Sequence, residues 1–448
     1  MATTPGHMVL NFDILISIMF YLSNMRDLVA LMQTCHALYR AAPPHILSLP
    51  YTIRSVTDFL SFATYVLSDG AMGDRTHLIK SLKFGVLTTG WHRNMLRATA
   101  IEALVKLIRR ATNIQSLDIV RSEMLLTLDP QILPSILGLH RVKSIKVTAA
   151  GVHALELLRK IQSPVSHVEL EFAMSFHADD PVPLLSAHTS TLESLVWRRG
   201  AVGGTGPQYI VLASLTLVMD DQLMLEPLMG CFPNLRSLRI ELAREQTVHP
   251  VFIEECRTTN VSVQSSHPMI WPTLDSLCGG TTALYSLGLV RPVKELQIPD
   301  IRDGHLFWFK SIVAESTPTT LELVANKYQV VEHVVKYLIE IDPTSLVNLI
   351  IILTPFDKPD ISPTTLINLI ARLGSIHLKF LKLNVKKTTI HRRINYVNEL
   401  MGSRGSVEKC RTLAEELFDR MPTVEHVALQ FGNSLCSNWF RDKGGLVG

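Results

Sequence analysis

Long apolar runs are missing from this chain of 448 residues. The longest aliphatic run, Leu349 to Leu353, has the length of a β-strand and falls far short of the roughly eighteen apolar residues that suggest a membrane span. No Lys or Arg precedes the first apolar segment, and Asn11 and Asp13 interrupt it, so it does not fit a secretory signal. The sequence therefore predicts a soluble, intracellular protein that has no membrane partner.

Cysteine and charge are both scarce. The six cysteines lie far apart and include no C-x-x-C pair, so we expect reduced thiols and no zinc site. Charged residues make up 19% of the chain and apolar residues 47%, a composition typical of a folded protein and not of a disordered one. The net charge of +3 is too small to attract nucleic acid by bulk electrostatics, so nucleic acid is not expected as a partner.

Catalytic motifs are absent as well. The chain contains no H-E-x-x-H, G-x-S-x-G or G-x-x-x-x-G-K-[ST] pattern. Its densest basic patch, at residues 386–393, has no interleaved aromatic side chains on which bases would stack, which favours a charged loop over a nucleic-acid site. We therefore expect a protein that is not an enzyme, with no catalytic residues, no cofactor and no metal.

The apolar residues near the start of the chain fall at helical spacing. This spacing predicts two or three short helices within residues 8–42. Asn11 is the expected N-cap of the first helix, and Ser23 or Asn24 that of the second. The helical pattern ends at Pro43, because proline cannot continue a helix. So short a segment cannot make an independent core, so we expect these helices to pack on another surface.

The order and spacing of these residues resemble the F-box. The matching positions are Leu10, Asp13, Ile14, Leu15, Ile18, Met19, Tyr21, Leu22, Asp27, Leu28, Leu31, Cys35, His36, Leu38, Tyr39 and Ala42. Two positions depart from the family pattern: Asn11 stands where the family usually has proline, and His36 stands in place of a basic residue. The alternative is an ordinary helical hairpin at the edge of the main core.

A second pattern, apolar-x-x-apolar-x-apolar, occurs thirteen times in the rest of the chain, and only Gly279 and Pro318 break its apolar rule. The middle apolar residues lie 19 to 46 positions apart, and helical stretches such as 100–111 and 330–341 separate them. Strand–turn–helix units of this length resemble leucine-rich repeats, although the Asn that usually follows the motif appears only as Asn326. Residues 271–298 also resemble a segment of fungal F-box proteins that carry such repeats. The thirteen middle residues are Leu82, Leu117, Ile145, Val168, Leu195, Leu215, Leu238, Leu277, Leu296, Leu321, Leu349, Leu381 and Val427.

Together these patterns predict an α/β fold: a small N-terminal helical F-box followed by an irregular leucine-rich-repeat solenoid, that is, a curved parallel sheet with outer helices. The alternative is a non-repetitive α/β domain, which would rarely need thirteen similar strands. The expected boundaries are 8–42 for the adaptor-docking module, 43–75 for a helical linker, 76–432 for the solenoid and 433–448 for a C-terminal tail.

An F-box followed by leucine-rich repeats resembles a substrate receptor of a Skp–cullin–F-box ubiquitin ligase. The resemblance implies that the N-terminal helices bind a Skp-type adaptor, and through it a cullin, while the repeats hold a protein substrate of unknown identity. Two alternatives stay open: a scaffold that binds the adaptor without ubiquitin transfer, and an enzyme built on a repeat scaffold. The predicted adaptor-binding residues are Leu10, Ile14, Leu15, Ile18, Met19, Leu22, Leu28 and Leu31.

Strand geometry predicts where the substrate lies. Alternate residues of a strand face opposite ways, so the residue between the last two apolar positions of each motif faces the concave side of the solenoid. Seven of these thirteen positions are charged, and the first four alternate in sign. The C-terminal loops are the alternative binding surface. The candidate substrate face consists of Lys83, Asp118, Lys146, Glu169, Arg239, Glu322 and Lys382.

Overall fold

The protein is seen here in a computed structural model, and its chain divides into two compact units, Met1–Trp197 and Arg198–Gly448. In each unit strands alternate with helices, which makes the fold α/β. The structure describes residues 11–22, 24–68, 74–85, 97–173, 180–200, 202–203, 206–219, 223–243, 249–267, 271, 273–354, 362–386, 406–431, 437–442 and 445–447.

Four short helices begin the first unit. The side chains of Asn11 and Asn24 accept hydrogen bonds from the backbone amides of Asp13 and Arg26, at 2.9 and 3.0 Å, and so cap the first two helices. Both caps confirm the prediction from the sequence. The helices are α1 (Phe12–Tyr21), α2 (Met25–Met32), α3 (His36–Ala41) and α4 (Pro43–Ser48).

These four helices have a small core of their own. Met19, Leu28, Leu38 and Ala42 are buried together, and half-buried apolar side chains from residues 15–49 surround them. These helices therefore bury part of their apolar surface against one another, which was not expected from the sequence. The reason is that α3 and its C-cap supply Leu38 and Ala42, which close the space between α1 and α2. We term residues 11–49 the N-terminal module.

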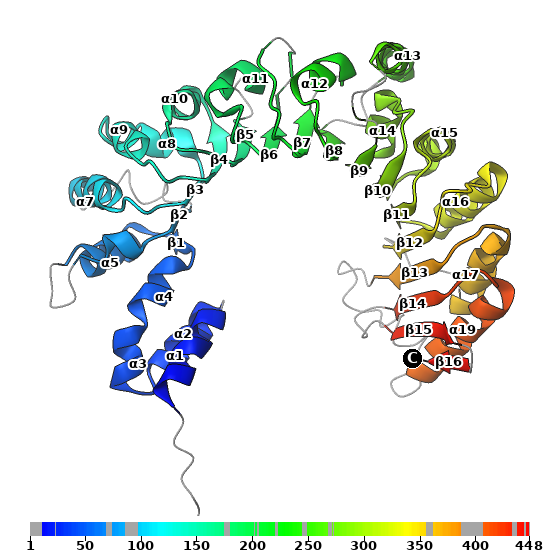
Figure 1. Ribbon diagram of the computed structural model, residues 1–448, viewed down its shortest axis with the longest axis horizontal. Helices are drawn as coiled ribbons and strands as arrows, with labels where there is room; N and C mark the ends of the chain where they lie inside the picture. Colours follow the sequence, from blue (N-terminus) through cyan, green and yellow to red (C-terminus); the bar gives the residue numbers. More distant parts are fainter. Residues whose placement is uncertain are drawn as a thin grey trace, which may run out of the picture. The chain divides into compact units, whose positions relative to one another are not determined.

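The rest of the first unit is a sheet with its helices on one side (Figure 1). Its strands lie side by side in sequence order, and the pairs from β1 to β5 are parallel. The strands are β1 (Tyr51–Ile53), β2 (Ser81–Phe84), β3 (Ser116–Ile119), β4 (Ser144–Ala150), β5 (His167–Phe172) and β6 (Ser194–Arg198). The helices are α5 (Val56–Leu67), η1 (Thr76–Leu78), α7 (Arg97–Arg110), α8 (Ser122–Leu126), α9 (Ile132–Leu137), α10 (Val152–Lys160), α11 (Pro181–Leu184) and η2 (Ser186–His188).

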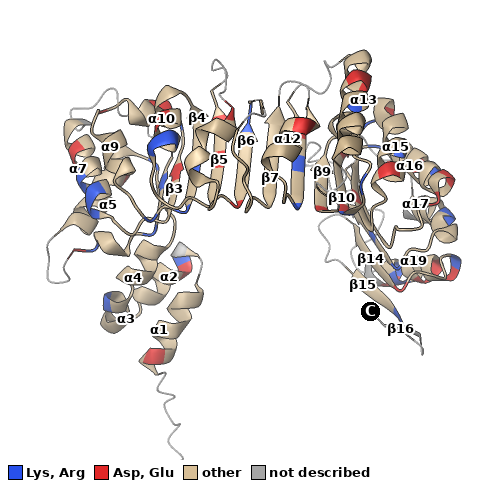
Figure 2. Ribbon diagram, turned by 45° about the horizontal axis from the view of Figure 1, so that its top comes forward, with Lys and Arg blue, Asp and Glu red and all other residues tan. Residues whose placement is uncertain are grey.

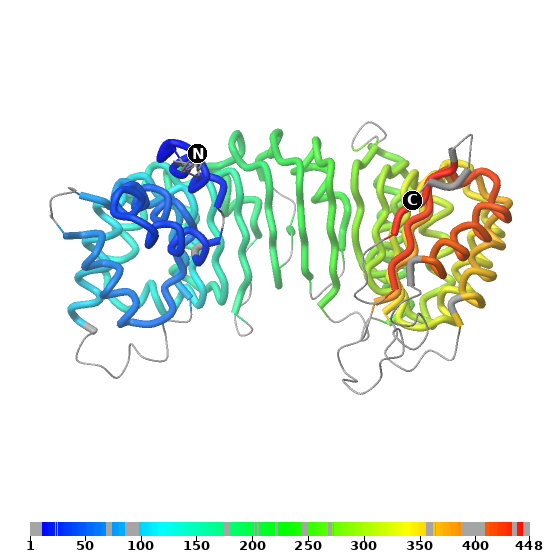
Figure 3. The backbone as a smooth tube through the Cα atoms, turned by 90° about the horizontal axis from the view of Figure 1, so that it is seen from below, coloured from blue at the N-terminus to red at the C-terminus, as the bar shows by residue number. Residues whose placement is uncertain are grey.

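The second unit repeats this arrangement, as the backbone trace in Figure 3 shows. Strands β7 to β14 are parallel neighbours, and β15 and β16 pair antiparallel at the end. The strands are β7 (Ser214–Met219), β8 (Ser237–Leu242), β9 (Leu274–Gly279), β10 (Val293–Ile301), β11 (Thr320–Ala325), β12 (Asn348–Leu353), β13 (Phe380–Val385), β14 (His426–Phe431), β15 (Ser437–Asp442) and β16 (Gly445–Val447). The helices are α12 (Leu225–Cys231), α13 (Pro250–Ser266), α14 (Thr281–Leu287), η4 (Asp303–His305), α15 (Leu306–Ser316), α16 (Tyr328–Ile341), α17 (Pro363–Ile370), η5 (Ala371–Ser375) and α19 (Ser406–Arg420).

The thirteen predicted motifs correspond to strands β2 to β14, and all thirteen middle residues are buried. The prediction of an α/β fold with a mostly parallel sheet and helices on one side is therefore confirmed. Two of the predicted segments contain strands that were not expected. β1 lies inside 43–75, expected as a helical linker, because its three residues are too short to show the motif. β15 and β16 lie inside 433–448, expected as a tail, because antiparallel end strands do not follow the motif of the repeats.

Successive repeats are joined by backbone hydrogen bonds just before each strand. The carbonyl oxygen of Lys80 accepts from two consecutive amides of the next repeat, those of Gln115 and Ser116, at 2.7 and 3.0 Å. The carbonyl oxygens of Lys143, Ala213, Arg236, Thr319, Val347 and Lys379 each accept in the same way. This recurring contact satisfies the backbone where each strand begins and sets the register of one strand on the next.

Polar side chains in the turns add hydrogen bonds between repeats. The Asn113 amide donates to the carbonyl oxygen of His77 at 2.7 Å, and the Thr191 hydroxyl donates to that of Val165 at 2.9 Å. Asn234 makes the same kind of bond, and each of these residues stands directly before the first apolar residue of its motif. These side chains therefore satisfy backbone carbonyl groups in the turns that precede the strands.

Candidate functional site

Helix α1 exposes large apolar side chains although its inner face is buried. Ile14, Ile18 and Tyr21 are 54%, 41% and 87% exposed. They are four and three residues apart, so they form one ridge along the helix, which we term the α1 ridge. Figure 2 shows α1 without charge after Asp13 at its start. An exposed apolar ridge of this kind is typical of a surface that another protein covers.

The predicted adaptor-binding residues differ in how exposed they are. Ile14 and Ile18 are exposed, but Met19 and Leu28 are buried inside the N-terminal module and cannot contact another protein while it is folded. Helical spacing identified an apolar stripe without distinguishing its inward edge from its outward edge. Three further predicted residues are half-buried against the same core: Leu15, Leu22 and Leu31.

Exposed aromatic residues of the module are absent from the predicted adaptor-binding set. Phe12, Phe20 and Tyr39 are 49%, 70% and 53% exposed, in addition to Tyr21. The Phe20 ring stands edge-on to the imidazole of His45, with ring centroids 3.9 Å apart, so it also reaches α4. The signal was present in the sequence, because aromatic residues outside the buried stripe of a helix are candidates for contact with a partner. Leu10, the first predicted residue, lies outside the described residues.

All seven residues of the candidate substrate face lie on the side of the sheets away from the helices. We term this side of each sheet the open face. In every case both flanking residues of the strand are buried, as the alternating pattern of β2 and β3 illustrates. In the first unit the four charged positions are direct cross-strand neighbours, in the order Lys83, Asp118, Lys146 and Glu169.

Ion pairs join these neighbours in the first unit. Lys83 Nζ lies 2.6 Å from Asp118 Oδ2, and Lys146 Nζ lies 2.7 Å from Glu169 Oε2. The alternation of sign seen in the sequence is therefore satisfied within the protein. These four charges stabilise neighbouring strands before any partner binds.

The open face of the second unit differs. Arg239 pairs with Glu241 two residues along the same strand, at 2.6 Å, and this hydrogen bond raises the pKa of the Arg239 guanidinium. Glu322 and Lys382 form no ion pair within the described residues. Ile350 lies between them, because it is the cross-strand neighbour of both.

Cys278 is the one thiol among the thirteen predicted open-face positions, but it is 7% exposed. Burial raises the pKa of this thiol and outweighs the opposing effect of Arg239; the carboxylates of Glu241, Glu322 and Glu295 raise it further. The thiol therefore stays protonated at neutral pH and is a poor nucleophile.

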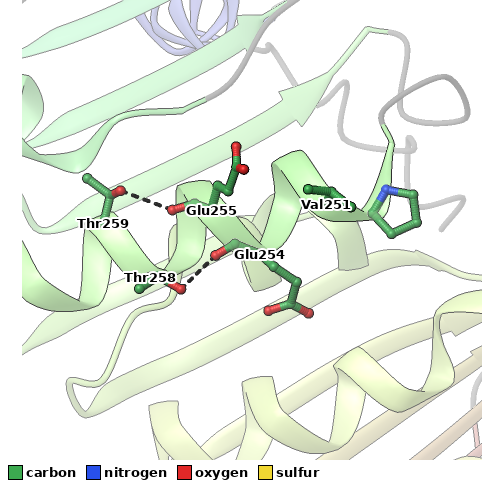
Figure 4. Close-up of a pocket in the computed structure, with 6 residues that line it drawn as sticks. Val251, Glu254, Glu255, Thr258 and Thr259 are labelled. Atoms are coloured by element: carbon green, nitrogen blue, oxygen red, sulfur yellow. Dashed lines mark hydrogen bonds between the residues drawn. The ribbon is translucent and has the colours of Figure 1, made fainter.

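A shallow hollow of about 600 Å³ lies along α13 (Figure 4). Thr258 and Thr259 line it, but their hydroxyls donate to the backbone carbonyls of Glu254 and Glu255. The two carboxylates point to different sides of the helix in Figure 4. The hollow therefore lacks polar groups that converge on one point, as a small-molecule site requires.

Within the described part of the chain, no group of three or more His, Cys, Asp or Glu side chains is placed to hold a metal ion. Nor does any described helix have the length and apolar character that crossing a membrane requires. A scan against models of protein families finds no match to this chain, and a search of the curated proteins finds none either.

Proposed function

We propose that this protein is the substrate-binding subunit of a Skp–cullin–F-box type ubiquitin ligase. In this proposal the N-terminal module is an F-box that binds a Skp-type adaptor, and the strand–helix repeats are irregular leucine-rich repeats that hold a protein substrate. The receptor itself breaks no bond. It raises the effective concentration of substrate lysines near the ubiquitin-loaded enzyme.

The α1 ridge is the observation that carries the proposal. The N-terminal module buries Met19 and Leu28 in its own core and still exposes Ile14, Ile18 and Tyr21 to solvent. A folded module with an uncovered apolar ridge suits a docking role better than a purely structural one. The match of residue order to the F-box supports the same assignment.

The sheets support the second half of the proposal. Parallel strands with helices on one side leave the open face available to a partner, and most of its side chains are polar or charged. The repeating backbone contacts before each strand agree with a repeat architecture, in which each unit contacts mainly its neighbours.

Binding of the adaptor tests the proposal. The variant Ile18→Asp places a carboxylate on the α1 ridge but outside the module's core, so the module stays folded. A charge buried unpaired in an apolar interface costs several kcal/mol, which lowers adaptor affinity about a thousandfold. Pull-down of a purified Skp-type adaptor by the full chain measures this. Leu15→Asp is the less informative variant, because Leu15 packs against the module's core.

Ala37→Asp is the matched control. It introduces the same charge at an exposed position in the first turn of α3, where the helix dipole favours a carboxylate. The proposal predicts normal adaptor binding for Ala37→Asp and loss of binding for Ile18→Asp. If Ile18→Asp binds the adaptor as the unaltered chain does, the F-box assignment is wrong.

A scaffold that binds the adaptor without ubiquitin transfer is the second candidate. It shares the α1 ridge and differs in what the adaptor recruits. If a cullin co-purifies with the unaltered chain but not with the Ile18→Asp variant, the ligase is supported. If the adaptor co-purifies without a cullin, the scaffold is supported.

A further inference from the structure

Strand β12 of the second unit is apolar on both faces. Leu349, Ile351 and Leu353 are buried in the core, while Ile350 and Ile352 lie half-buried on the open face. Strands that are apolar on both faces are typical of sheets covered on both sides. The open face of β12 therefore has the composition of a surface that is covered in the working state of the protein.

An aromatic row continues this surface across the next three strands. Phe380, His426 and Phe440 are direct cross-strand neighbours on the open face of β13, β14 and β15. Their ring centroids are 4.8 and 4.1 Å apart, and Phe440 at the end of the row is 49% exposed. Rings fixed by stacking on each other lose little conformational freedom when a partner packs on them.

Carboxylates border the apolar surface on its other side. Glu322 of β11 is the cross-strand neighbour of Ile350 and forms no ion pair within the described residues. Glu295 of β10 accepts a hydrogen bond from the neutral amide of Gln297 at 2.8 Å, so its charge is not neutralised by that contact. Both carboxylates contribute to the raised pKa of the neighbouring Cys278 thiol, which places them around one point of the face.

Lys382 makes the charge at β13 opposite to the charge at β10 and β11. It lies on β13 beside Ile350, on the side away from Glu322. A cationic group of a partner is therefore attracted to β10 and β11 and repelled from β13. From β10 towards β15 the open face is therefore first negative and then apolar and aromatic. It fits a partner segment that presents first a cationic and then an apolar side chain.

We propose that the open face of β10 to β15 binds an extended protein segment that carries Lys or Arg and, about four to six residues away, a large apolar side chain. The spacing follows from strand geometry: Glu322 lies about 12 Å from Phe380 and about 20 Å from Phe440, distances that four to six extended residues cover. The inference rests on the proposed function in one respect, since it takes this segment to be part of the substrate. Nucleic acid fits less well, because its phosphates would approach Glu295 and Glu322.

Defined peptides test the inference directly. The probes are fluorescein-labelled peptides of twelve residues, built from Gly, Ser and Gln. Each carries a pair of Arg residues and, five residues away from the pair, one Trp. One comparison peptide replaces Arg by Glu, one places Arg and Trp side by side, and a twelve-nucleotide oligouridine tests nucleic acid. Fluorescence anisotropy with the full chain measures affinity. We expect the Arg–Trp peptide of the predicted spacing to bind at least tenfold more tightly than each of the other three probes.

Two variants locate the site, and a third is the control. Glu322→Lys and Phe440→Ala should each weaken binding of the Arg–Trp peptide about tenfold or more. Glu332→Lys makes the same charge change at an exposed position of α16, on the helix side, and should bind like the unaltered chain. Equal binding by the chain and Glu322→Lys, equal binding of the Arg and Glu peptides, tighter binding of oligouridine, or no binding of any peptide overturns the inference.

Adaptor docking is measured separately in the same preparations. The variant Ile18→Asp should lose the adaptor and keep the peptide, whereas Glu322→Lys should lose the peptide and keep the adaptor. If the unaltered chain binds the adaptor but not the Arg–Trp peptide, this inference alone is refuted; if it binds the peptide but not the adaptor, the proposed function alone is refuted.

Discussion

On the open face of the first unit, oppositely charged side chains of adjacent strands form ion pairs; on that of the second unit, Glu322 and Lys382 are separated by a strand that presents Ile350 between them. The difference arises from which residues stand opposite each other, because both cross-strand neighbours of Glu322, Gln297 and Ile350, are uncharged. Charges on adjacent strands stand about 5 Å apart and can pair, whereas charges two strands apart are separated by about 10 Å. The cross-strand neighbour of a charged residue therefore decides whether its charge is neutralised within the protein.

This comparison separates stability from binding. In the first unit the charged residues Lys83, Asp118, Lys146 and Glu169 hold neighbouring strands together, so substitutions there should change folding first. In the second unit Glu322 is available to a partner, so Glu322→Lys should change binding and leave the free energy of unfolding within about 0.5 kcal/mol.

The largest expected effect is that of Lys83→Met in the first unit. The side chain of Asp118 is 16% exposed, and its Oδ1 atom has no hydrogen-bond partner among the described residues. Removal of Lys83 leaves this carboxylate without its cation, which should cost about 1–3 kcal/mol of unfolding free energy. Urea denaturation followed by circular dichroism measures the loss.

Two further variants sharpen this prediction. Lys80→Met removes an exposed lysine three residues earlier and should leave the unfolding free energy nearly unchanged. The double variant Lys83→Met with Asp118→Leu removes both charges and should recover most of the loss. Equal losses in Lys83→Met and Lys80→Met would show that the cross-strand pair contributes nothing.

A charge exchange tests the second ion pair, with a smaller effect. Lys146→Glu places two carboxylates opposite each other on β4 and β5 and should cost about 1 kcal/mol, because like charges in direct cross-strand positions destabilise a sheet. The double variant Lys146→Glu with Glu169→Lys should restore part of the unfolding free energy measured in urea, because it remakes the pair between β4 and β5 but leaves the new carboxylate opposite Asp118 on β3. If this exchange recovers stability but abolishes substrate capture, a partner contacts the open face of the first unit. The division of the two open faces into a structural one and a binding one is then wrong.

The sequence predicts the strands well because the signal for them is local. The apolar spacing within each motif decides which residues enter the core, so all thirteen middle residues were identified without knowledge of the neighbouring strands. Which charges pair is not local. Asp118 is the direct cross-strand neighbour of both Lys83 and Lys146, and it pairs with Lys83. The apolar spacing within each motif carries no information on that choice.

The N-terminal module shows the same limit at smaller scale. The spacing of Ile18 and Met19 predicts one apolar stripe, and both edges of that stripe look alike in the sequence. Met19 is buried and Ile18 is exposed because α3 packs against one edge only. Which edge of the α1 stripe is buried depends on how the chain turns after α2. The periodicity of α1 does not predict that turn.

The smallest expected effect concerns acid stability of the first unit. His188, in η2, is 3% exposed, and this burial lowers the pKa of its imidazole, although the backbone carbonyl of Leu158 opposes part of the shift. The folded state therefore binds a proton less readily than the unfolded state, whose histidine pKa is about 6.5. The contribution of His188 to stability is complete above that pH and declines as the pH falls from there towards the lowered folded pKa.

Thermal unfolding between pH 7.5 and pH 5 measures this decline. The variant His188→Gln, which does not titrate in this range, should show a flatter dependence of Tm on pH than the unaltered chain. The matched control His140→Gln removes an exposed histidine of the same unit and should keep the original dependence. The effect should be smaller than that of the ion-pair variants, since a single group contributes about 1.4 kcal/mol only when its pKa differs by a full unit between the two states. Identical pH profiles for His188→Gln and His140→Gln would mean that groups other than His188 govern the acid sensitivity of the first unit.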